Sequence, residues 1–210
     1  MIMVIPMYQE SNLIQNFLFT ISMNTRKKLK IKNKTRVFKK SELSSGDGML
    51  TTVWGPSMWH SLHTMSFNYP VNPTPEDKRN YKFHILNLQN VLPCKYCRMN
   101  IKKNFKKLPL TNSDMANRDT FSRYVYNLHE VVNKMLGKKS NLTYCDVRER
   151  YEHFRARCTT DTIKLKPSIE KGCTEPLYSG HKAKEVINIV PNETNCPTLT
   201  IDSKCFKQHV

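Results

Sequence analysis

The spacing of apolar residues in the middle of the chain predicts helices. One stripe repeats at intervals of three and four and consists of Trp59, Leu62, Ser66 and Tyr69. Pro70 follows it directly, and proline is typical of a helix that has just ended. We therefore expect a helix that stops at Pro70.

Two further stripes have the same period. The second consists of Tyr81, Ile85, Leu88 and Leu92. Pro75, followed by Glu76 and Asp77, is a typical signal for the start of its helix. The third and longest consists of Phe121, Tyr124 or Val125, Leu128, Val132 and Met135. Gly137, followed by Lys138 and Lys139, is typical of its end.

Shorter helices are expected at residues 97–106 and 144–157, and no part of the middle region alternates with period two. We therefore expect an all-α core, a bundle of about five helices. Composition divides the chain into a basic, disordered leader (1–50), the helical domain (51–158) and an extended C-terminal tail (159–210) rich in proline and threonine.

The 210 residues include 34 lysines and arginines against 17 acidic residues, which gives a formal net charge of +17. Residues 26–40 are especially basic, and we expect either a solvated tail or an arm that binds acidic proteins or nucleic acid. No apolar run is long enough for a membrane span, and no secretion signal opens the chain. We expect a protein that is not secreted, with Met23 as an alternative start of translation.

Seven cysteines are too few and too dispersed for a small secreted fold held together by disulfides. Cys94 and Cys97 stand three positions apart, behind Pro93 and at the start of a helix. Free N–H groups of a first helical turn stabilise a thiolate, and Lys95 and Arg98 add positive charge. The pair is therefore expected to exchange disulfides with a substrate dithiol.

Other interpretations of these cysteines remain open. A zinc site needs a second pair of ligands, but Cys145 and Cys158 are separated by twelve residues and neither forms a CxxC. Cys94 and Cys97 could also be plain buried side chains without a chemical role. If they bind zinc or are only buried, the net charge of the chain favours a basic nucleic-acid-binding protein.

Three motifs follow one another along the chain: WGPSMWHSLHTMSFNYP (54–70), LPCKYC (92–97) and YNLHEVVNKMLGK (126–138). Together they resemble the Erv/ALR family of FAD-linked sulfhydryl oxidases, and most closely the versions of large DNA viruses. The resemblance covers residues 51–158, and GCTEPLY (172–178) is similar to extensions in the viral branch.

The resemblance implies a four-helix bundle with a short fifth helix that binds FAD and forms a homodimer. Thiols of substrate proteins would attack the Cys94 sulfur of a Cys94–Cys97 disulfide. Cys97 would then pass electrons to the flavin, and oxygen would reoxidise the flavin and give hydrogen peroxide. The residues implied to bind FAD are Gly55, Trp59, His63, Tyr69, His129, Asn133, Lys138, Arg150 and Tyr151. The substrates would be thiol-containing proteins of a virion or its assembly, in the host cytoplasm or the virion.

The sequence also departs from the family pattern. Tyr126 stands where many cellular members have a cysteine that pairs near the position of Cys145, so Cys145 is expected to pair with Cys158 or stay free. Glu130 replaces a common asparagine, and Tyr151 replaces a tryptophan. Any second cysteine pair that relays electrons must come from the tail; the candidates there are Cys196 and Cys205, with Cys173 remaining.

Overall fold

The computed structural model describes residues 38–157, 173, 175–177 and 183–206. The chain divides into two compact units, Met1–Asp47 and Gly48–Val210. In the first unit the described part holds one short helix, α2 (Lys40–Leu43), with exposed side chains. The expected disorder of the leader, and most of the expected binding arm at 26–40, lie outside the described residues and stay predictions.

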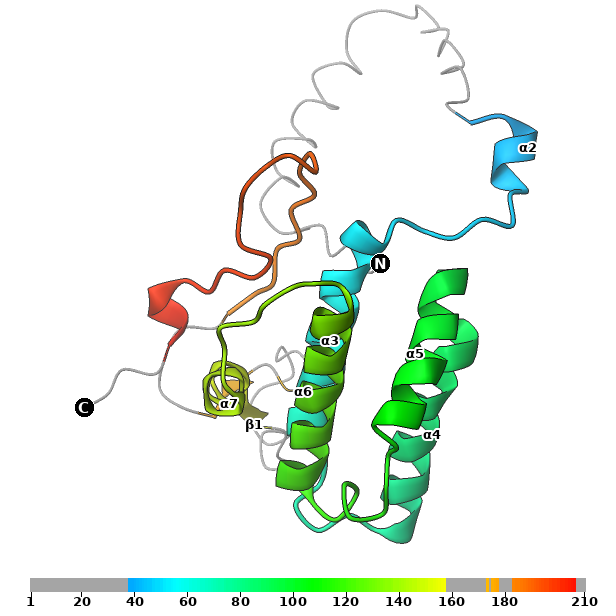
Figure 1. Ribbon diagram of the computed structural model, residues 1–210. Coiled ribbons are helices and arrows are strands. Elements are labelled where there is room, and N and C mark those ends of the chain that lie inside the picture. Colours follow the sequence, from blue (N-terminus) through cyan, green and yellow to red (C-terminus); the bar gives the residue numbers. More distant parts are fainter. Residues whose placement is uncertain (1–37, 158–172, 174, 178–182, 207–210) are drawn as a thin grey trace, which may run out of the picture. The chain divides into compact units, whose positions relative to one another are not determined.

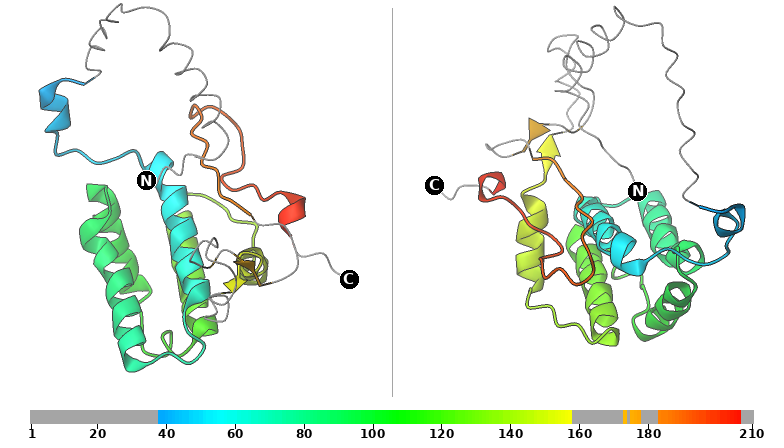
Figure 2. Two further views of the ribbon diagram at one scale, coloured as in Figure 1. Left: turned by 180° about the vertical axis from the view of Figure 1, so that it is seen from behind. Right: turned by 90° about the horizontal axis from the view of Figure 1, so that it is seen from above.

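The described part of the second unit holds five α-helices: α3 (Thr51–Asn68), α4 (Pro75–Val91), α5 (Lys95–Lys107), α6 (Arg118–Met135) and α7 (Tyr144–Glu152). Helix α3 packs on α6, α4 packs on α5, and α5 also contacts α6. Figure 1 shows these four helices side by side, with α7 viewed end-on. Both views of Figure 2 show α7 outside the four, where it contacts α3 and α6.

The expected all-α core is thus confirmed in the described part of the chain. Strands there are confined to one antiparallel pair, β1 (Ala156–Arg157) and β2 (Glu175–Pro176), and the tail adds a single 3₁₀ turn, η2 (Ser203–Cys205). The helix expected at 144–157 is shorter than predicted. It ends at Glu152 because His153 is its C-cap and the chain then pairs with β2. None of the described helices is long and apolar enough to cross a membrane.

Local signals explain where the helices start. Thr74 precedes Pro75 and forms a capping box with Asp77, and Thr143 does the same for α7 with Asp146. Asn117 accepts the N–H of Thr120 at the start of α6. At the other end of α6, Gly137 has a positive φ of 67°, as its place after the last turn predicts.

The predicted stripes supply most of the core. Their buried members share one cluster between the four long helices and include Leu62, Tyr69, Ile85, Leu88, Leu92, Phe121, Tyr124, Val125 and Leu128. A second, smaller cluster lies between α3 and α7 and consists of Phe67, Tyr144, Val147 and Tyr151. The second cluster holds the fifth helix against the bundle by burying apolar area.

Candidate active site

The cysteine pair lies at the turn between α4 and α5. Cys94 is the N-cap of α5, and its sulfur accepts the backbone N–H of Cys97 at 3.3 Å. Both cysteines are free and half-buried. The side chain at the N-cap therefore takes the place usually held by serine or aspartate, which favours negative charge on Cys94.

The segment before α3 lies directly on this turn. Met49 N–H donates to the carbonyl of Pro93 at 2.8 Å. A Cβ at Gly48 would lie 2.8 Å from that carbonyl oxygen and 3.1 Å from Cys94 Cα, so a larger residue would push the two segments apart. The hydroxyl of Thr51, the first residue of α3, lies 3.8 Å from Cys97 Sγ. Sequence reasoning missed Gly48 and Thr51, because the turn-rich SSGDG (44–48) before α3 marks only the end of the leader.

The two thiols differ in acidity. The pKa of Cys94 is lowered, chiefly by a hydrogen bond from the Cys97 thiol and further by the backbone N–H of Cys97 and by Thr51. Burial, and then the hydrogen bond to Cys94, raise the pKa of Cys97, while Thr51 lowers it. Arg98 donates to the carbonyl of Leu92 at 2.5 Å, so its charge is engaged there. In the dithiol form Cys94 is therefore the sulfur that ionises first, through hydrogen bonds rather than neighbouring charges.

A cluster of rings lies between α3 and α6. Trp59 and His129 stack with ring centroids 4.0 Å apart and an angle of 6° between planes. His63 Nε2 is 3.0 Å from His129 Nδ1, and the two imidazoles share a hydrogen bond. Trp59 and Cys97 both pack against the main core cluster. The structure thus brings together three residues that the resemblance assigned to the cofactor.

The imidazoles in this cluster are neutral at physiological pH. Burial, and to a smaller extent electrostatic interaction with the neighbouring His129 and His60, lowers the pKa of His63 to about 3. Burial and the positive charge of Lys138 lower the pKa of His129 to about 4. His63 is only 4% exposed, and its Nδ1 has no hydrogen-bond partner among the described residues. A buried polar atom without a partner is costly, so this nitrogen is a candidate to bond a ligand.

Helix α7 closes the cluster on one side. The Tyr151 hydroxyl lies 3.2 Å from His60 Nδ1, and its ring is 5.4 Å from that of His63. The Tyr151 ring also stacks on the ring of Phe67, with the ring centroids 5.3 Å apart. Burial raises the pKa of Tyr151 well above its usual range, so the phenol remains a hydrogen-bonding group. The tyrosine that replaces the family's tryptophan therefore joins the ring cluster.

The remaining predicted residues are placed less uniformly. Asn133 donates to Glu130 at 3.0 Å one turn beyond His129, and Lys138 follows the end of the same helix. Arg150 instead lines a hollow of about 250 Å³ with Leu142 and Phe206.

Two predicted residues have other surroundings. Tyr69 is fully buried in the core, where its hydroxyl donates to the carbonyl of Met115. It stands ten positions after Trp59, which is about 15 Å along a helix. A Cβ at Gly55 would meet only Thr51 Cγ2, at an ordinary 3.7 Å, so steric need is not what requires glycine there.

The cysteine pair and the last turn of α6 lie at the same end of the bundle because of its topology. The chain enters α3 beside the cysteine turn, and α5 starts there (Figure 1). Helix α6 begins at the opposite end and returns (Figure 1), so its last turn, which includes Asn133, ends toward the cysteine turn, and Lys138 follows it in the sequence. The structure thereby places a dithiol, stacked rings and a lysine along the same part of the bundle.

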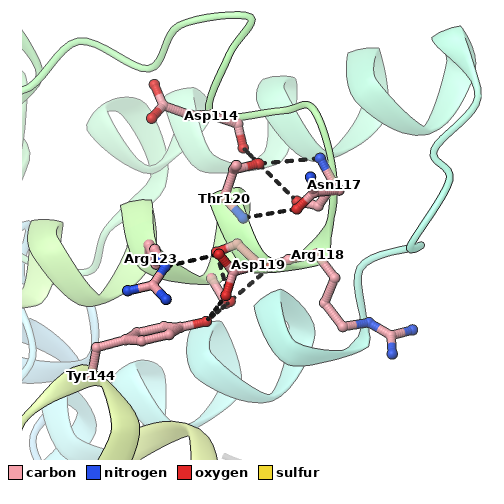
Figure 3. Close-up of polar contacts among 8 residues, drawn as sticks. Asp114, Asn117, Arg118, Asp119, Thr120, Arg123 and Tyr144 are labelled. Atoms are coloured by element: carbon pink, nitrogen blue, oxygen red, sulfur yellow. Dashed lines mark hydrogen bonds and ion pairs between the residues drawn. The ribbon is translucent and has the colours of Figure 1, made fainter.

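A larger cavity, of about 470 Å³, lies at the other end, beside the start of α6, and no predicted site residue lines it. Figure 3 shows the polar contacts around it. The Asp119 carboxylate accepts from Arg123 and from the Tyr144 hydroxyl, at 2.8 and 3.1 Å. Thr120 donates to the carbonyls of Asp114 and Asn117, both at 3.0 Å. These bonds fix the first turn of α6 and tie α7 to it.

The other cysteines take separate roles. Cys145 is free and exposed, so the alternative in which it pairs with Cys158 is not what the structure has. The Tyr126 hydroxyl instead donates to the carbonyl of Leu142 at 2.8 Å and links α6 to the approach to α7. Cys173 is disulfide-bonded, while Cys196 and Cys205 are free, and the electron relay through the tail stays a prediction.

The described residues also bear on whether the chain holds a metal site. Within the described residues, no three histidine, cysteine, aspartate or glutamate side chains are grouped so that they would hold a metal ion. The zinc interpretation of the cysteine pair thus lacks a set of ligands here, since a structural zinc site needs four.

A helical bundle that carries a free dithiol at a helix N-terminus and a pair of stacked rings is typical of a thiol-redox protein. A model of the Erv1 / Alr family matches residues 56–154. The probable FAD-linked sulfhydryl oxidase R368 of Acanthamoeba polyphaga mimivirus is 37% identical over 99 residues, which cover 47% of this chain and 68% of that protein. The FAD-linked sulfhydryl oxidase of African swine fever virus is 31% identical over 99 residues, 47% of this chain and 80% of that protein. The chain belongs to the Erv1/Alr family.

Among solved structures, the crystal structure of the yeast Erv1 core aligns with a TM-score of 0.45 and 22% sequence identity. The alignment covers 58% of this chain and 95% of that one.

The residues in the ring cluster fit a flat, partly anionic cofactor such as FAD. Trp59 and His129 present parallel rings, His63 keeps a buried nitrogen without a partner, and Lys138 supplies positive charge near His129. Flat aromatic groups stack on such rings, and a lysine near a helix end suits a pyrophosphate.

Proposed function

We propose that this chain is an FAD-linked sulfhydryl oxidase that forms disulfides in thiol-containing proteins. The observation that carries the proposal is the free Cys94 and Cys97 pair at the start of α5, on the same bundle as the stacked Trp59 and His129. The family membership and the names of the viral relatives support the same function.

The protein's part of the reaction is disulfide exchange. A substrate thiolate attacks the Cys94 sulfur of the Cys94–Cys97 disulfide; that bond breaks, and a mixed disulfide forms with Cys94. The second substrate thiol then displaces Cys94 and closes the substrate disulfide. Two electrons and two protons have passed to the protein, which is left as the dithiol seen here, with Cys97 hydrogen-bonded to Cys94.

The N-cap position of Cys94 assists the second step of this exchange, in which Cys94 is the leaving group. Its sulfur accepts the Cys97 N–H, so a thiolate leaving from Cys94 is stabilised by the first turn of α5. Cys97 is the more buried sulfur and packs toward the core cluster that also receives Trp59. Cys94 is therefore suited to exchange disulfides with the substrate, and Cys97 is suited to pass electrons to the cofactor.

Trp59, His63 and His129 would hold the cofactor by stacking and hydrogen bonding, with Lys138 near its phosphates. The chemistry that FAD supplies when bound is acceptance of two electrons from the dithiol and their transfer to oxygen, which gives hydrogen peroxide. Both histidines are neutral at pH 7, so each brings a hydrogen-bond donor and an acceptor without adding charge.

The proposal extends to assembly and setting. A homodimer is supported by Phe83 and Val91, two exposed apolar residues eight positions apart on α4, which a second copy would cover. Light scattering that gives the mass of a single chain would reject it. Action in the host cytoplasm or in a virion is the setting suggested by the viral relatives.

The decisive experiment follows oxygen consumption with dithiothreitol as the dithiol. We expect the purified protein to be yellow from bound flavin and to consume oxygen, and Cys97→Ala to keep the colour and lose nearly all turnover. Cys145→Ala, which removes an exposed cysteine outside the site, is the matched control and should leave turnover unchanged. A colourless protein, or full activity in Cys97→Ala, would reject the function.

A further inference from the structure

Positive charge is concentrated on the helical hairpin that carries the cysteine pair. Residues 78–113 contain nine lysines and arginines and no aspartate or glutamate, whereas the whole chain has 17 acidic residues. These residues span nearly all of α4, the cysteine turn and the whole of α5. The most uniformly charged part of the described chain is therefore the part that presents Cys94.

The charges of α5 lie on its outward face. Its inward face is buried and consists of Ile101, Asn104 and Phe105. The exposed basic side chains are Lys95, Lys102, Lys103, Lys106 and Lys107. Helical spacing arranges the outward residues in two rows, one with Lys95, Met99, Lys102 and Lys106, the other with Tyr96, Lys103 and Lys107. Both rows begin beside the cysteine pair and lead away from it.

The stability of the helix does not explain these charges. Lysines in the last turn favour the helix dipole, which accounts for Lys106 and Lys107, but Lys95 in the first turn opposes it. Like charges four positions apart, as in Lys102 with Lys106, destabilise a helix slightly. No ion pair in the described part of the chain involves a residue of α5. The face is therefore costly to the isolated protein and fits a partner of opposite charge.

Exposed apolar side chains lie on both segments next to the cysteine turn. Tyr96 and Met99 on α5 are 73% and 47% exposed, and Met49 and Leu50 before α3 are 68% and 74% exposed. The Met49 hydrogen bond to Pro93 holds that second segment beside the cysteine turn. A group of large exposed apolar residues bordered by charged residues is typical of a surface that binds another protein.

We propose that the outward face of α5, with Met49 and Leu50, is the docking surface for the substrate protein, and that it selects a dithiol segment with apolar residues at the thiols and acidic residues beyond them. This inference rests on the proposed function and names its substrate class. A protein is favoured over nucleic acid because the face ends at Cys94, so its occupant is delivered to a sulfur that reacts only with thiols or disulfides. Nucleic acid has the charge but nothing for this site to oxidise.

The test compares peptides that differ only in charge. Two dithiol peptides share the same thiols and apolar residues, and one carries four glutamates where the other carries four glutamines. With the full-length flavoprotein at low salt, we expect kcat/KM to be about tenfold higher for the acidic peptide, mostly through KM. The preference should vanish at about 0.5 M salt, because screening removes attraction between exposed charges.

Charge variants locate the effect on α5. Lys102→Gln combined with Lys106→Gln should lower kcat/KM for the acidic peptide about fivefold, since each exposed ion pair contributes only modestly to binding. Turnover of dithiothreitol should not change. Lys134→Gln combined with Lys184→Gln removes the same charge from exposed positions outside the hairpin and should have no effect. Flavin content and helical circular dichroism check that each variant is folded.

The outcomes separate this inference from the proposed function. If the unaltered protein does not oxidise dithiothreitol, the proposed oxidase function is rejected. Normal dithiothreitol turnover with equal kcat/KM for both peptides, or with an unaffected Lys102 and Lys106 variant, would reject the docking surface alone. Inhibition of peptide oxidation by a DNA duplex, without preference between the peptides, would assign the face to nucleic acid and also overturn the inference.

Discussion

Single residues around the cysteine pair set the acidity of its sulfurs. Cys94 caps α5, and its pKa is lowered by hydrogen bonds, whereas burial raises the pKa of Cys97. Thr51 is the side chain outside α5 that lowers both, from 3.8 Å to Cys97 Sγ. The ionisation of the pair is therefore shared between α5 and the first turn of α3.

Thr51→Val tests that sharing. Valine keeps the shape of threonine but removes the hydroxyl, so we expect the pKa values of both thiols to rise and thiolate to appear at higher pH. The measurement is the ultraviolet absorbance of thiolate in the reduced protein as the pH increases. Thr52→Val, an exposed neighbour in the same helical turn, is the control. An unchanged titration in Thr51→Val would mean that the hydroxyl does not reach the sulfurs in solution.

At the scale of elements, the end of α3 depends on two arginines from other parts of the chain. Arg118 donates to the carbonyl of Tyr69 at 2.6 Å, and Arg155 donates to that of Phe67 at 3.0 Å. Both carbonyls belong to the end of a helix, where acceptors lack intrahelical partners and the dipole favours positive charge. Glu152 holds Arg155 in place through two oxygens, at 2.6 and 2.7 Å.

Arg155→Ala should therefore destabilise the fold by about 1 to 2 kcal/mol, the usual loss for a partly buried, charge-assisted hydrogen bond. Chemical denaturation at neutral pH measures it. Arg123→Ala breaks the exposed ion pair with Asp119 and should cost less than about 1 kcal/mol. Equal losses in the two variants would contradict the role of Arg155 at the end of α3.

For the whole molecule, the neutral histidine pair makes stability depend on pH. The folded pKa values of His63 and His129, about 3 and about 4, lie below the ordinary value of 6.5. The unfolded chain therefore binds protons first as the pH falls. The stability that these groups contribute is fully present above pH 6.5 and is lost as the pH falls toward about 4 for His129 and about 3 for His63.

We expect the free energy of unfolding to be lower by about 4 kcal/mol at pH 5 than at pH 7, about 2 kcal/mol from each histidine. Denaturation curves at several pH values measure it, and His63→Gln should flatten the dependence even though it lowers stability at pH 7. His60, Tyr151 and Lys138 also face the pair and stay in place in that variant. An unaltered slope in His63→Gln would show that other groups control the pH response.

The sequence by itself determined the helices and the position of the redox pair, because both depend on local pattern. Thr74 with Pro75, and Gly137, mark helix ends within one turn of themselves, and apolar residues every three or four positions have only one face to bury. Pro93 before Cys94 likewise predicts a dithiol at a helix start. The expected end of α7 was wrong because the pairing of β1 with β2 joins segments far apart in the sequence.

Only the tertiary structure decided which residues meet. Gly48 and Thr51 lie against the cysteine turn because the start of α3 reaches it across 46 positions of sequence, and Trp59 stacks on His129 across 70. Tyr69 has the same spacing as its neighbours in the stripe but is buried at the far end of α3. Such contacts follow from how whole helices pack, which is set by the sum of many buried side chains rather than by any local pattern.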